Sequence, residues 1–186
     1  MVFKTNRMKS TIIKTLQVAF LLVIGFAFNG DLNAQATTVA EIAKDHETEN
    51  EGWLVDLDEA YRLSAKTGKP IMANFTGSDW CGWCKKLTKS VFVHKEFKEW
   101  ADKNVILLEL DYPRRKALPG PLKQQNDGLK QAFQIRGFPT VWVFDLDKDA
   151  EGKFTIDPYG KTGYTKSPGE FISGVEQMFD KKKQGS

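Results

Sequence analysis

The stretch DWCGWCKKL, residues 79–87, contains both cysteines of a chain of 186 residues, and a tryptophan precedes each of them. Two cysteines separated by two residues can form a structural disulfide, bind a metal or carry out redox chemistry. A disulfide between Cys81 and Cys84 closes so small a loop that it removes little entropy from the unfolded chain. A structural zinc ion needs four ligands, and the chain has only two histidines, His46 and His94. The spacing therefore favours a redox pair over a static disulfide or a metal site.

The flanking sequence predicts that the pair lies where a strand gives way to a helix. The apolar run IMANF, residues 71–75, has the length of a buried strand, and apolar residues recur at helical intervals after Cys84. At a helix N-terminus, free backbone N–H groups and the helix dipole would stabilise a Cys81 thiolate. Such settings lower a cysteine pKa from about 8.5 to roughly 3.5–7.5. We expect Cys81 to be the nucleophile and Cys84 the resolving thiol.

No cofactor is expected beside this pair. A covalently bound c-type haem needs a histidine directly after the second cysteine, and the chain has Lys85 there. The acidic residues of the stretch 145–156 do not match a calcium loop, because its sixth and twelfth positions hold Ala150 and Ile156. We therefore expect neither a bound metal nor an organic cofactor.

The remaining pattern predicts an α/β domain. A strand, a long helix and a second strand in succession imply a parallel pair with a right-handed crossover. The three prolines and basic cluster of residues 112–128 predict a long surface loop. The predicted order is a strand at 53–55, a helix from Asp56 to Gly68, a strand at 71–75, a helix after Cys84 broken near His94, a strand at 105–111, a helix at 126–135, a strand at 137–145, a strand at 153–157 ended by Pro158, and a helix from Ser167.

The N-terminus has the layout of a secretory signal peptide. Four basic residues precede an apolar run at 18–28, and small and polar residues follow it. We expect residues 1–34 to be the signal, cleaved after Ala34 or Ala36, then a polar linker at 35–52, the folded domain at 53–183 and a short tail at 184–186. The apolar run is shorter than the ~20 residues that span a bilayer, so no stable membrane insertion is expected after cleavage. The expected location is the periplasm, in preference to the extracellular space.

Loss of that segment would also remove the positive charge of the chain. Residues 1–34 carry four basic side chains and one acidic one, which leaves 23 of each sign from totals of 27 and 24. A neutral chain gives no electrostatic reason to expect nucleic acid as a partner. The remaining length suits one domain, with no spare segment for dimerisation, so a monomer is expected.

Two motifs together carry a family resemblance. WCGWC at residues 80–84 follows an apolar strand, and GFPT at residues 137–140 precedes the next long strand. From about Trp53 to Lys183 the chain resembles the thioredoxin superfamily, and in particular its exported protein disulfide reductases and isomerases. The resemblance implies a thioredoxin-like three-layer fold, in which helices flank a central mixed sheet. It also implies a Cys-x-x-Cys pair at a helix N-terminus and a cis-proline loop.

The resemblance assigns roles to residues around the cysteines. A cis peptide bond before Pro139 would leave the backbone of Phe138 free to pair with an extended substrate segment beside the reactive sulfur. Gly82 and Trp83 stand between the cysteines, and Trp83 is expected to face the substrate rather than the core. For Trp80, core packing and substrate contact are equally compatible with the sequence.

The sequence also departs from the commonest thioredoxin pattern. Gly82 and Trp83 replace the usual Gly-Pro, and the stretch FTGSDWC is one residue longer than the usual approach to the pair. Asn74 stands where many members hold a buried acid that moves protons to and from the resolving cysteine. Asparagine cannot ionise, so a water or Asp79 would have to take that part.

These observations lead to three functional hypotheses. The first is an exported thiol-disulfide oxidoreductase that reduces or isomerises protein disulfides, with protein substrates and an upstream redox partner. The second is a non-catalytic interaction module with a static disulfide, which would use its tryptophan-rich surface and the 112–128 loop. The third is a membrane-tethered electron relay, which requires that the N-terminal segment is retained. No residue of the sequence sets the reduction potential, so a reductase, an isomerase and an oxidase are not separated, although a reductase or isomerase is favoured over an oxidase.

Overall fold

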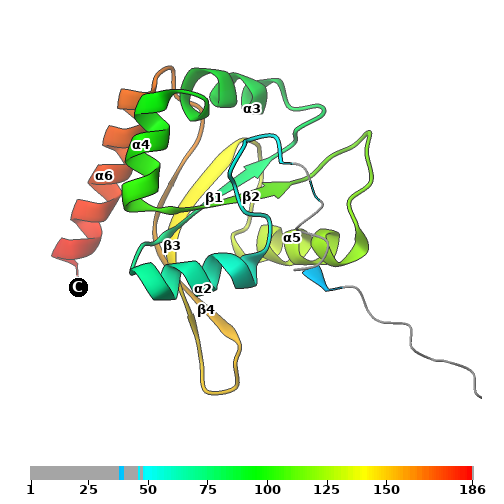
Figure 1. The fold of residues 1–186 in the computed structure, drawn as a ribbon, viewed down its shortest axis with the longest axis vertical. Helices are drawn as coiled ribbons and strands as arrows, with labels where there is room; N and C mark the ends of the chain where they lie inside the picture. The colour runs from blue at the N-terminus through cyan, green and yellow to red at the C-terminus, as the bar shows by residue number, and fades with distance from the viewer. Residues whose placement is uncertain (1–37, 40–45, 47, 186) are drawn as a thin grey trace, which may run out of the picture. The chain divides into compact units, whose positions relative to one another are not determined.

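The computed structural model describes residues 38, 39, 46 and 48–185. The predicted signal peptide, most of the predicted linker and Ser186 lie outside the described residues. Within the described part of the chain, no helix has both the length and the apolar character needed to cross a bilayer. The elements in chain order are α2 (Leu57–Thr67), β1 (Ile71–Thr76), α3 (Gly82–Leu87), the π-helix η1 (Thr88–Phe92), α4 (Lys95–Asn104), β2 (Ile106–Asp111), α5 (Gly120–Ala132), β3 (Thr140–Lys148), β4 (Phe154–Thr162) and α6 (Pro168–Gln184) (Figure 1).

The sheet is mixed, as the sequence predicts. Its strand order is β2-β1-β3-β4, in which β1 and β2 are parallel while β3 runs antiparallel to both of its neighbours. Since β1 and β3 are antiparallel, the end of β1 and the start of β3 lie at the same edge, where Phe75 pairs with Thr140. The loop that carries the cysteines and the loop that carries Pro139 therefore emerge side by side.

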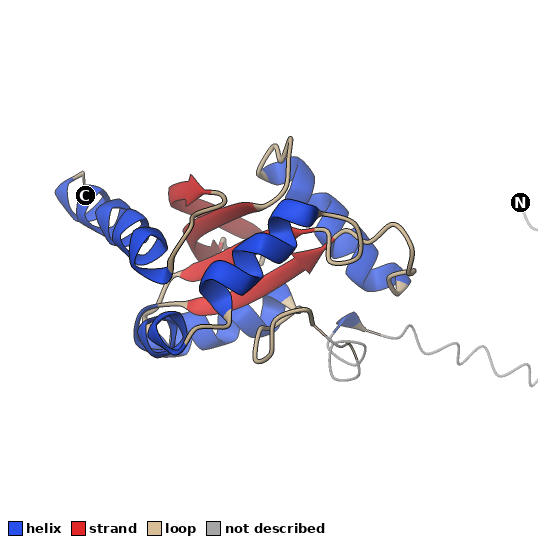
Figure 2. Cartoon of the chain, turned by 90° about the horizontal axis from the view of Figure 1, so that it is seen from above, coloured by secondary structure: helices blue, strands red, loops and turns tan. Residues whose placement is uncertain are grey.

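Helices cover both faces of this sheet and complete the three predicted layers. The alternation of side chains along β1 sends Met72 to one face and its neighbours Ile71 and Ala73 to the other. Met72 packs in a core with residues of α3, η1, α4 and α6, whereas Ile71 and Ala73 pack with residues of α2 and α5. Figure 2 shows helices on both sides of the strands.

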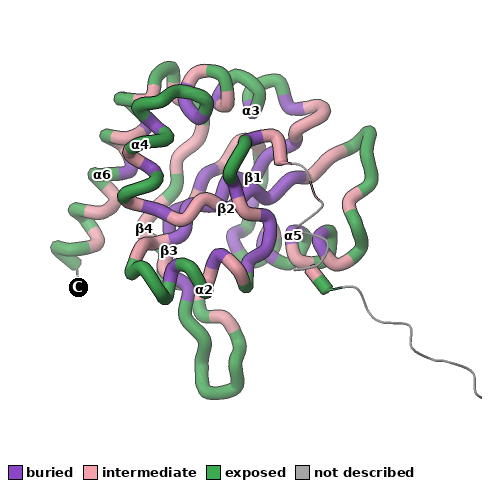
Figure 3. Tube along the Cα trace, viewed as in Figure 1, coloured by how far each residue is buried: buried purple, intermediate pink, exposed green. Residues whose placement is uncertain are grey.

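Burial is greatest along the inner strands. Every residue of β1 is buried, and Figure 3 shows the buried residues concentrated on β1 and its neighbours while the tip of the β3–β4 hairpin is exposed. The loop that carries the cysteines thus starts from the most buried strand of the sheet.

The ends of α2 and the break before α4 confirm predictions from the sequence. The Asp56 side chain accepts hydrogen bonds from the backbone N–H groups of Asp58 and Glu59, and Gly68 ends the helix with a left-handed φ of 70°. After η1, α4 starts at Lys95 with His94 as its N-cap residue. Capping residues read from the sequence therefore located these boundaries correctly.

The predicted loop at 112–128 and the predicted helix start at residue 126 are wrong. Helix α5 begins at Gly120, so the irregular segment ends at Pro119. Pro121 lies in the first turn of the helix, where backbone N–H groups have no partner within the helix and proline costs little. The prolines mark the start of a helix rather than an extended loop.

Two strand predictions also need correction. Pro158 does not end β4, which continues to Thr162. Pro158 pairs with Phe144 at a shift in register, and β4 is an edge strand, where proline is tolerated. The predicted strand at 53–55 is reduced to a single bridge between Leu54 and Leu108, because the chain turns into α2 directly afterwards.

Candidate active site

The two cysteines form a disulfide at the start of α3. Cys81 and Cys84 are joined by an S–S bond of 2.08 Å, with their Cα atoms 5.3 Å apart. Cys81 is the N-cap residue of α3, and the backbone N–H of Cys84 donates a hydrogen bond to the Cys81 sulfur at 3.1 Å. The sulfur thus takes the place of the side-chain oxygen that usually caps a helix. The same donor would stabilise negative charge on Cys81 in the reduced protein.

A tight turn delivers Cys81 to this position. The Gly77 carbonyl oxygen, which directly follows β1, accepts hydrogen bonds from the backbone N–H groups of Trp80 at 3.2 Å and Cys81 at 2.8 Å. Both cysteines are largely buried, with 5% of Cys81 and 2% of Cys84 exposed. Because so little of the pair is in solvent, a substrate must dock closely to reach it.

The cis-proline loop lies against the same turn. The Phe138–Pro139 peptide bond is cis, which is the isomer that the sequence predicts. The Phe138 ring lies 5.7 Å from the Trp80 ring in an edge-to-face arrangement. The backbone N–H and C=O of Phe138 form no hydrogen bond with any described residue. A strand-like segment could therefore pair with them.

Trp80 is held from three sides rather than packed in a core. Its indole N–H donates to the Tyr112 carbonyl oxygen at 2.8 Å, and the Arg114 guanidinium lies 3.6 Å from the centre of its ring. A Cβ atom at Gly77 would lie 2.6 Å from the same ring, which is too close for any side chain. Gly77 is thus required by the position of Trp80, and the sequence analysis did not single it out.

Asp79 anchors the segment that follows β2. Its carboxylate accepts hydrogen bonds from the backbone N–H groups of Arg114, Arg115 and Lys116. Desolvation acts to raise the pKa of Asp79, but these three donors outweigh it and lower the pKa. A carboxylate held in its charged form in this way is poorly suited to the proton transfer that the sequence analysis considered for it.

Trp83 presents an exposed aromatic surface beside the disulfide. It is 55% exposed, its ring lies 5.0 Å from that of Tyr164, and the Lys86 ammonium lies 4.2 Å from its ring centre. A Cβ atom at Gly82 would meet no neighbouring atom within 4 Å, so the fold itself does not require glycine there.

Polar side chains are buried on the face of the sheet that α3 covers. Asn74 is 2% exposed and lies beside Glu109 in the register of β1 and β2. The Asn74 Oδ1 and Thr76 Oγ1 atoms are buried and have no hydrogen-bond partner among the described residues. The position where the resemblance implies a buried acid is therefore neutral, while the neighbouring strand carries a carboxyl group.

Glu109 holds residues that the sequence analysis assigned to the linker. Its carboxylate accepts hydrogen bonds from the backbone N–H of Glu49 at 2.8 Å, from that of Asn50 at 3.2 Å and from Asn50 Nδ2 at 2.6 Å. Burial raises the pKa of Glu109. Desolvation, followed by the charges of Glu109 and Asp111, raises the pKa of Glu49 to about 7.

Asp111 connects the carboxyl groups of Glu49 and Glu109 to the turn before the cysteines. Its carboxylate accepts hydrogen bonds from the Ser78 backbone N–H at 2.8 Å and the Ser78 hydroxyl at 2.6 Å, and the Lys116 ammonium lies 3.4 Å away. Within the described residues, no group of three or more metal-binding side chains lies close enough to hold an ion.

Comparison with known proteins places these features in a family. A family model described as thioredoxin-like matches residues 52–145, about half of the chain. The chain is 33% identical over 106 residues to the disulfide bond reductase DsbH of Chlamydia pneumoniae, covering 57% of this chain and 64% of that protein. It is 30% identical over 101 residues to the thioredoxin-related protein DsbJ of the same organism, covering 54% of this chain and 29% of that protein. The chain thus spans less than two thirds of the length of these relatives.

A solved structure agrees with the sequence matches. The structure titled DsbH Oxidoreductase is 30% identical in sequence, with a TM-score of 0.59, and the match covers 73% of this chain and 92% of that one. The disulfide at the start of α3 and the mixed sheet between two helical layers agree with the family match over residues 52–145. The chain belongs to the thioredoxin-like family.

Proposed function

We propose that this protein is a thiol-disulfide oxidoreductase that reduces or isomerises protein disulfides. The observation that carries the proposal is the hydrogen bond from the Cys84 backbone N–H to the Cys81 sulfur at the first turn of α3. It gives Cys81 a fixed donor that favours a thiolate, in a chain whose relatives include a named disulfide bond reductase. No such arrangement is needed for a static disulfide.

Reduction of a substrate proceeds in two exchanges. The Cys81 thiolate attacks one sulfur of the substrate disulfide, the substrate S–S bond breaks, and one substrate thiolate leaves while a mixed disulfide forms. Cys84 then loses its proton and attacks the Cys81 sulfur, which releases the second substrate thiolate. The two electrons that the substrate gains come from the two thiols, which become the Cys81–Cys84 disulfide.

The resulting disulfide must be reduced again for a second turnover. This requires a dithiol partner, which donates two electrons and two protons by the same exchange in reverse. Isomerisation needs no net electrons, because the substrate resolves the mixed disulfide with another of its own thiols and Cys81 leaves as a thiolate.

Substrate contact falls to the exposed groups around the sulfur. Phe138 offers its free backbone groups to an extended segment, with Pro139 fixing the turn beside it. Trp83 and Trp80 provide aromatic surface on either side of Cys81, and Gly82 keeps the helix start free of a side chain. Because the pair is largely buried, these contacts would decide which disulfides come within reach.

Export of the protein is a further part of the proposal. The layout of residues 1–34 supports a cleaved signal peptide and a periplasmic protein, with a domain at 53–183 that acts as a monomer. Mass spectrometry of the mature protein tests it, since cleavage after Ala34 or Ala36 gives a defined new N-terminus. An intact N-terminal segment in the mature protein would favour the membrane-tethered relay.

The catalytic proposal is tested with two single variants. Cys81→Ser removes the nucleophile and should abolish insulin disulfide reduction, whereas Cys84→Ser leaves attack possible and should accumulate covalent mixed disulfides with substrates. Unchanged insulin reduction by Cys81→Ser would refute the proposal. A reduction potential of the pair below about −300 mV, typical of structural disulfides, would favour the non-catalytic module instead. Recovery of scrambled ribonuclease then separates an isomerase from a reductase.

A further inference from the structure

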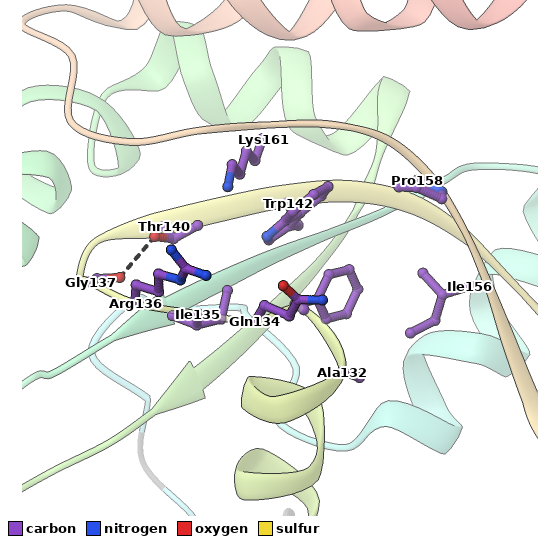
Figure 4. Close-up of a pocket in the computed structure, with 11 residues that line it drawn as sticks. Ala132, Gln134, Ile135, Arg136, Gly137, Thr140, Trp142, Ile156, Pro158 and Lys161 are labelled. Carbon is purple, nitrogen blue, oxygen red and sulfur yellow. Dashed lines mark hydrogen bonds between the residues drawn. The ribbon is translucent and has the colours of Figure 1, made fainter.

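A groove adjoins the cis-proline loop. It has a volume of about 680 Å³ and lies between the segment that joins α5 to β3 and the paired strands β3 and β4 (Figure 4). Its lining includes Gly137 and Thr140, which flank the Phe138–Pro139 bond, and the Thr140 hydroxyl donates a hydrogen bond to the Gly137 carbonyl oxygen at 2.8 Å. Phe138 therefore lies next in the chain to a residue that lines the groove.

The charges of the groove are of one sign. Arg136 and Lys161 line it, and no acidic residue is among the lining residues. Neither cation forms a salt bridge with a described residue, although the Lys161 ammonium lies 5.3 Å from the ring centre of Trp142. Both side chains are drawn among the lining residues in Figure 4. The groove therefore attracts an anion and offers it donors.

Trp142 adds a buried donor beside Lys161. The Trp142 indole N–H is buried without a hydrogen-bond partner among the described residues, and Figure 4 shows its nitrogen facing the groove. A buried donor of this kind costs free energy until an acceptor meets it. The apolar wall behind it includes Phe133, whose ring lies 5.3 Å from that of Trp142. The site combines charge, a directional donor and an apolar surface.

We propose that this groove binds the carboxylate of an acidic residue in the substrate polypeptide, close to the cysteine that reacts with Cys81. An extended chain advances about 3.3 Å per residue, so a segment paired with Phe138 reaches Arg136 within roughly two to four residues. The carboxylate accepts from Arg136, Lys161 and the Trp142 N–H, which together satisfy its two oxygens. The groove thus selects disulfides in acidic sequence, and this selectivity rests on the function proposed above.

The selectivity is measured with disulfide peptides of one sequence that carry either Glu or Gln at two, three or four residues from the cysteine. We measure the rate constant with which each peptide oxidises the reduced full-length protein. This value is divided by the rate constant with which the same peptide oxidises dithiothreitol, so that the intrinsic reactivity of the peptide disulfide cancels. We expect a Glu-to-Gln ratio of about five to ten at low salt for the best position. The ratio should approach one at ~1 M salt, where charges are screened beyond about 3 Å.

Variants identify the groove as the source of that ratio. The double substitution Arg136→Gln with Lys161→Gln should bring the ratio to about one, and Trp142→Phe, which removes the donor, should lower it. Lys153→Gln removes an exposed cation outside the groove and should leave the ratio unchanged. A ratio of one in the unaltered protein, or a ratio that survives the double substitution, overturns the proposal.

A binding measurement separates this inference from the proposed function. In a Cys81→Ser and Cys84→Ser chain, fluorescence anisotropy of labelled Glu and Gln peptides reports binding without redox chemistry. Tighter binding of the Glu peptide that is lost with Arg136→Gln and Lys161→Gln supports the groove even if the unaltered protein reduces neither peptide. Reduction of both peptides at equal rates, with equal binding, overturns the groove and leaves the oxidoreductase proposal intact.

Discussion

The two faces of the sheet bury different kinds of side chain. Towards α2 and α5, β1 and β2 contribute only apolar residues to the core, whereas towards α3 they bury Met72 and, nearer the cysteines, polar residues. The apolar set is Ile71, Ala73, Phe75, Leu108 and Leu110, and the polar set is Asn74, Thr76, Glu109 and Asp111.

Both faces carry an apolar core, but only on the face covered by α3 do β1 and β2 bury polar groups as well. Burying polar groups costs free energy unless they find partners, so their concentration on one face needs a reason beyond packing. The polar set lies along the strand ends that lead to Gly77 and the cysteines, and Asp111 reaches Ser78 directly. Substitutions in the apolar set and in the polar set should therefore change the stability of the protein by different amounts.

The largest effect is expected on the apolar face. Phe75 is fully buried, with its ring 5.5 Å from that of Phe133, and Phe75→Ala should cost about 3–5 kcal/mol of unfolding free energy by leaving a cavity. Thr76→Val is the matched change on the polar face. It keeps the shape and removes a hydroxyl without a partner, so it should be neutral or slightly stabilising. Urea unfolding measures both, and an equal loss in the two variants would remove the distinction between the faces.

Glu109→Ala should have the next largest effect, about 2–3 kcal/mol. The substitution leaves the backbone N–H groups of Glu49 and Asn50 and the Asn50 amide without their acceptor. Hydrogen exchange at the amides of Glu49 and Asn50 should accelerate with the loss of stability, and Glu109→Gln, which keeps one acceptor, should lose less. Unaltered exchange at these two amides would mean that Glu109 does not hold the segment before Trp53.

Gly77→Ala tests the edge where the polar face meets the cysteines. The added methyl group would displace the Trp80 ring and its hydrogen bond to Tyr112, at a cost of roughly 1–3 kcal/mol and with slower disulfide reduction. Gly128→Ala, inside α5 and with nothing within 4 Å of its Cβ, should instead stabilise the protein by up to about 1 kcal/mol. Thermal unfolding and insulin reduction are measured for both, and equal behaviour would contradict the close packing at Gly77.

The smallest effect concerns pH. Because the pKa of Glu49 is raised from 4.5 to about 7, the folded state holds its proton more tightly than the unfolded state. The contribution to stability is complete below pH 4.5 and is lost as the pH rises through about 7. Glu49→Gln should abolish this loss and gain about 1 kcal/mol or less at pH 8, since the half-buried side chain is partly screened by solvent. Parallel pH profiles of unfolding for both proteins would show that Glu49 does not titrate in this way.

The fold was predictable because its signals are local. The spacing of Cys81 and Cys84, the capping residues Asp56 and Gly68, and the motif before Pro139 each depend on a few neighbouring residues. Where two local readings compete, as for the prolines before α5, the choice depends on whether the following residues pack as a helix, and that is decided by the rest of the molecule.

The contacts around the site were harder to predict because they join distant parts of the sequence. Gly77 is required only because the Trp80 ring lies over it, and the ring is held there by the Tyr112 carbonyl and Arg114. In the sequence, Glu109 only interrupts an apolar strand, whereas in the structure its carboxylate accepts hydrogen bonds from residues 49 and 50. The signal available was the presence of acids inside the run VILLELD, where an isolated buried charge would not be tolerated.

The hold of Asp79 on the three amides has a consequence for limited proteolysis. Arg114, Arg115 and Lys116 are successive trypsin sites on an exposed segment, yet a protease must draw such a segment out into an extended form before it cuts. While the Asp79 carboxylate accepts hydrogen bonds from these amides, the three sites are exposed to solvent but resist cleavage. The rate of tryptic cleavage in this segment therefore reports whether Asp79, two residues before Cys81, keeps its hydrogen bonds to the segment.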